Sequence, residues 1–286
     1  MDLFPNFHSP IARATNALMD DLIINYGDAF EAVSNAVLGV LLLVEQALRA
    51  VPPGVMIVLI GLLAYAAGRR VVFALASAAG TWLIGALGMW DAAMQTLAII
   101  LVSVGISVVA GLPLGMLAAS SAHVRRVLMP VLDLMQTIPS FVYLIPAAML
   151  FGLGKVPAIM ATVIYAIPPL IRLTDLGIRE VDAAVVEASR AFGATRMQIL
   201  RSVQIPLSLP TIMQGINQTT MMALSMVVIA SMIGARGVGE QVLLGLQRND
   251  SGQGLVGGIT IVILAVVIDR ITQAYGRRLQ RHRAGA

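Results

Sequence analysis

The stretch Glu187-Ala188-Ser189-Arg190-Ala191-Phe192-Gly193, followed after nine intervening residues by Val203-Gln204-Ile205-Pro206, is a polar, arginine-containing interruption between two long apolar segments. In a helix with 3.6 residues per turn, four apolar positions near its start share one narrow stripe: Val181, Val185, Ala188 and Phe192. Gly193 can adopt the positive φ that ends a helix, and Thr195 can cap a second helix that runs to Pro206. The stretch therefore predicts a helix–turn–helix hairpin with one face that can be buried.

The composition around this hairpin is that of an integral membrane protein. Hydrophobic residues make up 58% of the 286 and charged residues 12%, with a mean hydropathy of +0.87, whereas soluble domains are about half apolar and a quarter charged. A chain of this length can supply about seven spans of some 20 residues each, with nothing left for a separate soluble domain. The net charge of +4 is spread over several loops without interleaved aromatic residues, so no nucleic-acid partner is predicted. Cysteine is absent, which excludes disulfides and thiolate sites.

Seven apolar runs predict the spans, near residues 52–68, 71–89, 92–119, 127–151, 156–173, 207–233 and 255–274. If the N-terminus lies outside, fourteen of the nineteen basic residues fall in cytoplasmic segments, as the positive-inside rule requires. The opposite orientation would violate that rule. The hairpin and the C-terminus are therefore expected in the cytoplasm.

An acidic, amphipathic stretch precedes the first predicted span. Six of its apolar residues form one helical stripe: Phe30, Val33, Val37, Leu41, Val44 and Leu48. This pattern predicts an interfacial helix along the outer surface. Glu45 lies in the most apolar part, and a buried, unpaired carboxylate costs several kcal/mol, which disfavours a full crossing. An eighth span is the alternative.

The hairpin sequence resembles the EAA loop of ABC-importer membrane subunits. Its Glu-Ala start, Gly193 and Pro206 stand in register with that motif, while Ser189 replaces an alanine and Ile205 replaces a leucine. In that family the loop is a cytoplasmic helical hairpin that docks into a groove on the ATPase subunit and transmits its motion to the membrane helices. The resemblance implies ATPase-coupling roles for Glu187, Ala188, Ser189, Gly193, Val203, Ile205 and Pro206.

Further blocks resemble the glycine betaine, proline betaine and choline branch of these permeases, the binding-protein-dependent transport system inner membrane components. The similarity covers roughly residues 50–276 and rests on Gly111–Gly115, Leu132–Pro139, Phe141–Pro146, Gly215–Thr219, Ala223–Ala230 and Asp269-Arg270. The family has a Gly-Gly-Leu-Gly turn where this chain has Arg236-Gly237-Val238-Gly239, so the local contact there can differ.

This resemblance implies the fold, the partners and the location. The expected fold is all-α and integral to the membrane, the type I ABC importer transmembrane fold, with about seven spans plus the N-terminal interfacial helix. The implied partners are a second copy of the chain, a cytoplasmic ABC ATPase dimer that binds ATP and Mg, a periplasmic or surface substrate-binding protein and the lipid bilayer. The chain itself is expected to be non-catalytic, to bind no cofactor or metal and to lie in the inner (plasma) membrane of a bacterium.

The expected organisation has four parts. Residues 1–50 form the amphipathic outer-surface region, and residues 51–89 form two peripheral spans. Residues 90–276 form the permease core, including the coupling loop 180–206, and residues 277–286 form a basic cytoplasmic tail.

The expected function is passage of a quaternary ammonium compound through the chain, with the energy supplied by the partner. Polar and flexible residues of the sixth predicted span, together with two aromatic residues that can contact such a cation, are the candidates for lining the path: Asn217, Gln218, Thr219, Met222, Ser225, Met226, Phe141 and Tyr143. The pattern does not choose among glycine betaine, proline betaine, choline and carnitine.

Other chemistry has little support in the sequence. No glycine loop ending in Gly-Lys-Ser/Thr is present, and the three histidines are far apart in the sequence, which disfavours ATP binding and catalysis. An ion-coupled secondary transporter or channel for small organic cations is the alternative, and it calls for ionisable groups within the spans. Asp133 is expected to pair with Arg125 or Arg126 and Asp269 with Arg270, which leaves neither as a relay.

Three glycines and four prolines lie inside or at the ends of the predicted spans. Gly105, Gly111 and Gly115 are small enough to let helices approach closely. The prolines remove backbone donors and can kink the helices that contain them: Pro139, Pro146, Pro168 and Pro169.

Overall fold

The computed structural model describes residues 7–284, with side chains for residues 7–276. Residues 1–6 of the expected outer-surface region and the side chains of the expected basic tail 277–286 lie outside this description. Within it the chain is helical and contains no strand. The α-helices are α1 (His8–Ala50), α2 (Pro53–Gly68), α3 (Val71–Ala86), α4 (Trp90–Ser120), α5 (Ala122–Thr137), α6 (Leu144–Phe151), α7 (Lys155–Arg179), α8 (Ala183–Ala191), α9 (Arg196–Ile199), α10 (Ile205–Ala230), α11 (Val238–Gln247) and α12 (Ser251–Ala284). Short 3₁₀ turns η1 (Ser140–Tyr143) and η3 (Ser231–Ile233) and the π-helical turn η2 (Leu200–Gln204) complete the list.

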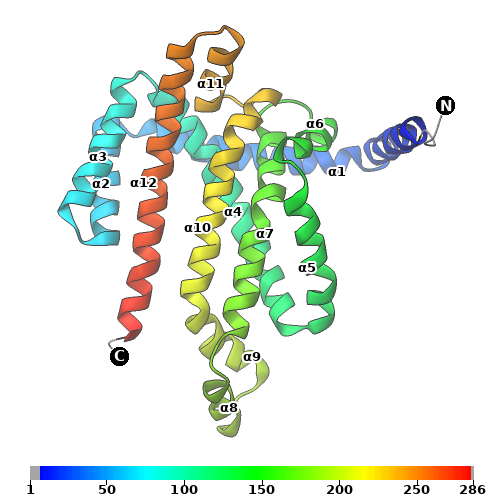
Figure 1. Ribbon diagram of the computed structural model, residues 1–286, viewed down its shortest axis with the longest axis vertical. Helices are drawn as coiled ribbons and strands as arrows, with labels where there is room; N and C mark the ends of the chain where they lie inside the picture. The colour runs from blue at the N-terminus through cyan, green and yellow to red at the C-terminus, as the bar shows by residue number, and fades with distance from the viewer. Residues whose placement is uncertain (1–6, 285–286) are drawn as a thin grey trace, which may run out of the picture.

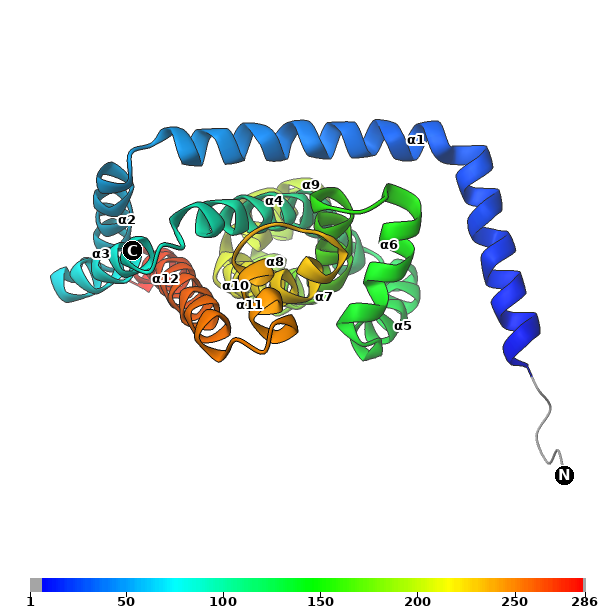
Figure 2. The same cartoon turned by 90° about the horizontal axis from the view of Figure 1, so that it is seen from above.

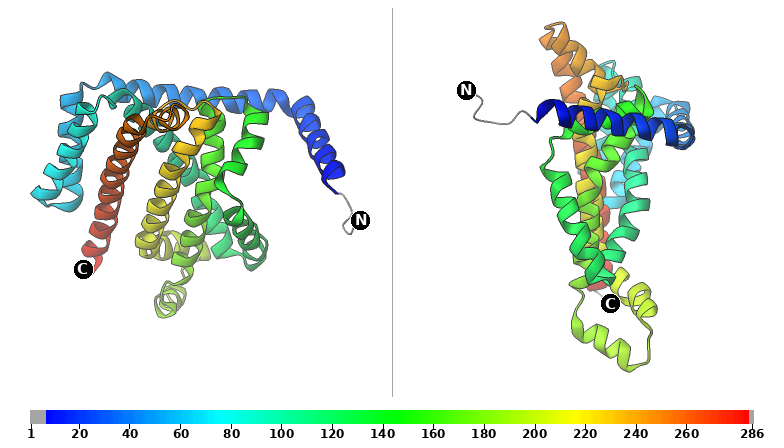
Figure 3. Two further views of the ribbon diagram at one scale, coloured as in Figure 1. Left: turned by 45° about the horizontal axis from the view of Figure 1, so that its top comes forward. Right: turned by 90° about the vertical axis from the view of Figure 1, so that its right-hand side faces the viewer.

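Four long helices, α4, α7, α10 and α12, run side by side and form the body of the molecule (Figures 1 and 3). α7 is the central one, because most of its residues are buried and both α4 and α10 pack along it. α2 and α3 form a shorter hairpin at one edge, against α12 (Figure 2). The hairpin of α8 and α9 projects from one end of the body, and α1 and α11 lie at the other (Figure 1).

Glycines allow α4 and α10 to approach α7 closely. A Cβ added at Gly115 would lie 2.5 Å from Cβ of Thr174, and one at Gly111 would lie 3.0 Å from Leu170. Gly215 of α10 meets the other side of Leu170 in the same way. Close backbone approach through small residues is the usual packing device between helices in lipid, where the hydrophobic effect does not drive association. The expectation is confirmed for Gly111 and Gly115, but wrong for Gly105, which is exposed and meets nothing.

Five helices within the described residues are long and apolar enough to cross a membrane, or six if one bent pair counts as a single span. The five comprise α1, α4, α7, the continuous helix 196–233 and α12. α2 and α3 are apolar but have 16 residues each, less than the roughly 20 that span a bilayer core when upright.

The run at 127–151, predicted as one continuous span, is broken in the structure. α5 and the segment Ser140–Phe151 meet at 107°. The break lies at Ile138, whose ψ of 128° is extended, directly before Pro139. A proline ring disfavours helical geometry at the residue before it, which explains why the helix stops there.

α1 runs crosswise to the long helices, along one side of the bundle and toward the end opposite the hairpin of α8 and α9 (Figures 1 and 2). Its apolar stripe packs on the body: Leu41 is fully buried in a cluster with Ile99 of α4 and Ile159 of α7, and Val37 and Val44 pack against that cluster. Phe30 meets Phe151 of α6 edge to face, with ring centroids 5.5 Å apart. The stripe predicted for residues 30–48 therefore faces protein along much of its length.

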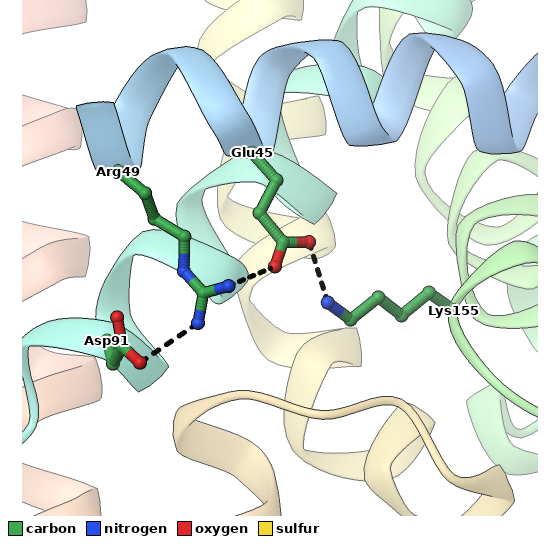
Figure 4. A network of polar contacts seen from close by, with 4 residues as sticks. All are labelled: Glu45, Arg49, Asp91 and Lys155. Atoms are coloured by element: carbon green, nitrogen blue, oxygen red, sulfur yellow. Dashed lines mark hydrogen bonds and ion pairs between the residues drawn. The ribbon is translucent and has the colours of Figure 1, made fainter.

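Glu45, next to Val44 of the stripe, is buried, but it is not unpaired. Its Oε2 lies 2.6 Å from Nζ of Lys155, and its Oε1 lies 3.1 Å from Nη1 of Arg49 (Figure 4). Arg49 also reaches Asp91 at the start of α4, with Nη2 and Oδ2 3.0 Å apart. The premise that Glu45 lacks a partner is wrong because Lys155, 110 residues away in the sequence, is brought against it by the packing of α1 on α7.

Replacing Lys155 by methionine should loosen α1 without unfolding the bundle. Arg49 stays beside Glu45 and Lys155 is partly exposed, so we expect a loss of about 1–2 kcal/mol, below the 3–5 kcal/mol typical of fully buried pairs. Faster protease cleavage within residues 7–50 and a lower thermal unfolding midpoint would report it. Arg13→Met, at an exposed site on the same helix, is the control. Equal cleavage of the two variants would contradict the prediction.

Candidate functional site

The hairpin of α8 and α9 has the turn chemistry that its sequence predicts. Asp182 caps α8 by accepting a hydrogen bond from the backbone N–H of Ala184 at 2.9 Å. Gly193 has a φ of +82° and ends that helix. Thr195 then caps α9 in a reciprocal box: the N–H of Gln198 donates to Oγ1 of Thr195, and the N–H of Thr195 donates to Oε1 of Gln198. The predicted roles of Gly193 and Thr195 in the turn are confirmed.

The hairpin packs little against its own chain. None of the nine residues of α8 is buried, and Phe192 is 93% exposed. The stripe that can be buried according to the sequence, which includes Val185, therefore faces outward. Glu187 and the arginines Arg190, Arg196 and Arg201 are exposed around it. Phe192, Val185 and Met197 are exposed together on this short hairpin, among charges of both signs, and such a group of apolar side chains is typical of a contact surface for another protein.

The second half of the hairpin leads directly into α10. The helix does not end at Pro206, as the sequence predicts, but continues through it. The turn before the proline is π-helical: the N–H of Ile205 donates to the carbonyl of Leu200, five residues back. Val203, Ile205 and Pro206 are half-buried at this joint. The amide of Gln204 donates to the carbonyl of Ile178, 3.3 Å away, and so ties the joint to α7.

The candidate path-lining residues of α10 lie on three faces. Gln218 and Ser225 are exposed, and Met222 is half-buried beside them. Thr219 and Met226 are fully buried, and Met226 lies in a cluster with Tyr143. Asn217 faces α12, where its Nδ2 donates to Asp269. Only the first of these faces is open in the single chain.

The two aromatic candidates differ in exposure. Phe141 in η1 is 57% exposed, beside the break between α5 and α6. Tyr143 is buried, donates its hydroxyl hydrogen to the carbonyl of Met135, and lies 6.3 Å from the ring of Tyr165. Phe141 is therefore the one that a solute can reach without movement of its neighbours.

The acidic residues within the spans have partners other than those expected. Asp133 of α5 pairs with Arg172 of α7, not with Arg125 or Arg126. Asp269 of α12 accepts hydrogen bonds from Asn217, at 3.0 Å, and from Gln273, at 2.7 Å, rather than pairing with Arg270. Both corrections have the same cause: a neighbouring helix places a donor level with the carboxylate along the bundle, and such a contact between helices cannot be read from residues that are adjacent in the sequence.

One residue that the sequence interpretation passed over is Asp175. It is buried near the end of α7 and contacts both Arg125 and Arg179. Arg179 follows it at four residues, the spacing of neighbours on one helix face, and that spacing is the signal that could have drawn attention to it.

Metal ligands are not gathered anywhere in residues 7–276: no group of three or more His, Cys, Asp or Glu side chains lies close enough together to hold an ion.

Comparisons with known proteins point in one direction. A family model described as "Binding-protein-dependent transport system inner membrane component" matches residues 111–281. The glycine betaine/proline betaine transport system permease protein ProW of Escherichia coli (strain K12) is 47% identical over 277 residues, 97% of this chain and 78% of that protein. The glycine betaine transport system permease protein OpuAB of Bacillus subtilis (strain 168) is 43% identical over 273 residues, 96% of each. Among solved structures, an inward-facing MetNI methionine ABC transporter matches with a TM-score of 0.57 and 27% identity, over 66% of this chain and 92% of that one.

Proposed function

Because the chain belongs to the family of binding-protein-dependent transport system inner membrane components, we propose that it is the membrane subunit of an ATP-driven importer for quaternary ammonium compounds. Glycine betaine, proline betaine and choline are the proposed substrates, since relatives at 47% and 43% identity are named as permeases for the first two. The family consists of non-catalytic transport subunits. The observation that carries the proposal is the exposed hairpin of α8 and α9, which holds the EAA-like residues at one end of the bundle.

The proposed site of ATPase coupling is this hairpin, with Glu187, Ala188, Ser189 and Gly193 in its first half and Val203, Ile205 and Pro206 in its second. The outward-facing Phe192 supports a docked partner, because a single chain in water gains nothing from displaying such a side chain. ATP and Mg bind to that partner. Closure of two ATPase subunits pushes on the hairpin, which is continuous with α10 and bonded to α7, and tilts both helices to open the path.

The proposed assembly is a homodimer in a bacterial inner membrane, with the path at the two-fold axis and a substrate-binding protein outside. The arginines of the hairpin and Arg125 lie at one end of the bundle, and Lys155 and Arg236 belong to loops and helix ends at the other. This division supports a cytoplasmic hairpin and C-terminus and an outer N-terminus. In that orientation α1 lies at the outer interface, which supports its role as an amphipathic outer-surface helix. We further propose that the short apolar helices α2 and α3 are two peripheral spans at 51–89 beside a core at 90–276, which gives seven spans when the bent pair counts as one.

The proposed path is lined by α10 and by the segment after the break at Pro139. Exposure of Phe141, Gln218 and Ser225 supports these three as groups that meet the solute. A quaternary ammonium group has no hydrogen to donate, so the face of an aromatic ring suits it better than a hydrogen-bond acceptor. Met222 is half-buried on the same face as Gln218 and Ser225. Met226, Asn217, Thr219 and Tyr143 lie behind this surface and come into reach only as the helices tilt.

Reconstitution in liposomes tests the proposal. The chain is assembled with its ATPase, the binding protein is added, and uptake of labelled glycine betaine and choline is followed with and without ATP. Uptake that needs all three components is the expected result. Flux by the chain alone, driven by an ion gradient or voltage, would establish a secondary transporter or channel instead, and no flux in any combination would refute a transport role.

A further inference from the structure

Asp175 is a buried carboxylate in the last turns of α7, directly before the hairpin. Its side chain is 4% exposed, and each of its oxygens has an arginine of its own. Oδ1 lies 3.0 Å from Nε of Arg179, one turn further along α7. Oδ2 lies 3.2 Å from Nε of Arg125, in the first turn of α5. One side chain therefore joins the beginning of α5 to the end of α7.

The other ion pair between these two helices is of a different kind. Asp133 of α5 and Arg172 of α7 also meet, with the charges exchanged between the helices, but Asp133 is 63% exposed. Exposed ion pairs hold helices weakly, whereas a buried carboxylate that loses its partner is strongly destabilised. The contact at Asp175 is therefore the stronger of the two, and the exposed pair at Asp133 serves as its control.

Contacts on either side extend this joint in two directions. Toward the hairpin, Gln204 donates to the carbonyl of Ile178, three residues from Asp175. Toward the membrane, Leu132 of α5 packs with Ile167 and Ile171 of α7 in one buried cluster. At the far end of α5, the hydroxyl of Tyr143 donates to the carbonyl of Met135, across the break that separates α5 from η1. A continuous set of contacts therefore runs from the hairpin to the broken segment.

We propose that Asp175 is a positioning residue that makes α5 and the end of α7 one moving body, so that displacement of the hairpin reaches the break at Pro139 and the exposed Phe141. This inference rests on the proposed function. α5 stays helical through Pro130, which has no backbone N–H to donate, and the other backbone hydrogen bonds of this 16-residue helix let it transmit displacement along its axis with little compression. Without the joint, the hairpin would move α7 and α10 while α5 stayed behind.

The test uses the complete transporter in liposomes and compares Asp175→Asn with Asp133→Asn. Asp175→Asn should lower the amount of glycine betaine imported per ATP hydrolysed by about tenfold, with hydrolysis itself within about twofold of wild type. Asp133→Asn, at the exposed pair, should leave the ratio within about twofold. Asp175→Glu, which keeps the charge, should restore most of it. A wild-type ratio for Asp175→Asn would overturn the proposal.

A second measurement follows the moving body directly and covers the case in which Asp175→Asn does not fold. The chain has no cysteine, so spin labels can be attached at engineered cysteines alone. Val127 of α5 and Leu176 of α7 are exposed sites on the two helices. In the wild type, the distance between the two labels should be the same without nucleotide and with ATP trapped. In Arg125→Gln, which leaves Arg179 beside Asp175, this distance should change with nucleotide. A nucleotide-dependent separation in the wild type would refute the joint.

A spin-label pair at Leu207 of α10 and Leu255 of α12, both exposed sites, distinguishes a failure of the proposed coupling function from a failure of the role proposed for Asp175. If its distance does not respond to ATP, the coupling function itself fails. If it responds while α5 and α7 separate, only the role of Asp175 fails.

Discussion

Replacing Gly115 by valine should force α4 and α7 apart and abolish uptake. Even the first added carbon would lie 2.5 Å from Cβ of Thr174 and 2.9 Å from the carbonyl oxygen of Ile171, and a backbone oxygen on a central helix cannot move aside. Overpacking of a tight core costs about 1–3 kcal/mol, and the backbone clash puts this site at about 3 kcal/mol or more. The apparent thermal unfolding midpoint in detergent should fall by about 6 °C or more.

Gly105→Val on the same helix is the matched control. A Cβ there meets nothing within 4 Å, and the site is exposed. We expect its midpoint to stay within about 2 °C of wild type, because surface substitutions away from special features change stability by about 0.5 kcal/mol or less. Equal midpoints for the two valine variants would contradict the close packing of α4 on α7.

Replacing Gly193 by valine should remove uptake while leaving the protein inserted in the membrane. The φ of +82° at Gly193 is strained for an L-residue by about 1–2 kcal/mol and by more for a β-branched one, which shifts the hairpin about tenfold or more away from this turn. No neighbour lies within 4 Å of a Cβ placed there, so the effect is confined to the backbone conformation. ATP-driven uptake and co-purification with the ATPase are the measurements.

Gly193→Asn is the control for this change, since asparagine tolerates the left-handed region better than other residues. It should keep most of the uptake that valine removes. Loss of uptake in both variants would mean that the site needs the absence of a side chain, as at a close protein contact, and unimpaired uptake in Gly193→Val would count against docking through this hairpin.

Local features of the chain were accessible from the sequence because they depend on neighbours a few residues apart. The turn at Gly193 and the cap at Thr195 are of this kind, and both are present in the structure. The long apolar helices α4, α7, α10 and α12 are equally local in origin, since an apolar run of sufficient length has few alternatives to a helix in lipid.

Features that depend on distant partners were not accessible. Glu45 is stabilised by Lys155, and Asp269 by Asn217, and no periodicity links these positions. The break at Ile138 required a choice among several prolines: Pro168 and Pro169 lie inside α7 without a break of this kind, because the helices on either side hold α7 along its length. Tertiary packing decides which proline interrupts a helix and which is tolerated.

The π-helical turn at residues 200–204 has a geometric consequence for how the hairpin is aimed. This π-helical turn contains one residue more than an α-helical turn would. Each residue of an α-helix rotates the chain by about 100° around the helix axis. The direction in which α8 points, measured around the axis of α10, is therefore set by that single extra residue. In a chain one residue shorter there, an α-helical turn would replace the wide one, and Phe192 would lie about 100° further around the helix axis, away from the face it now presents.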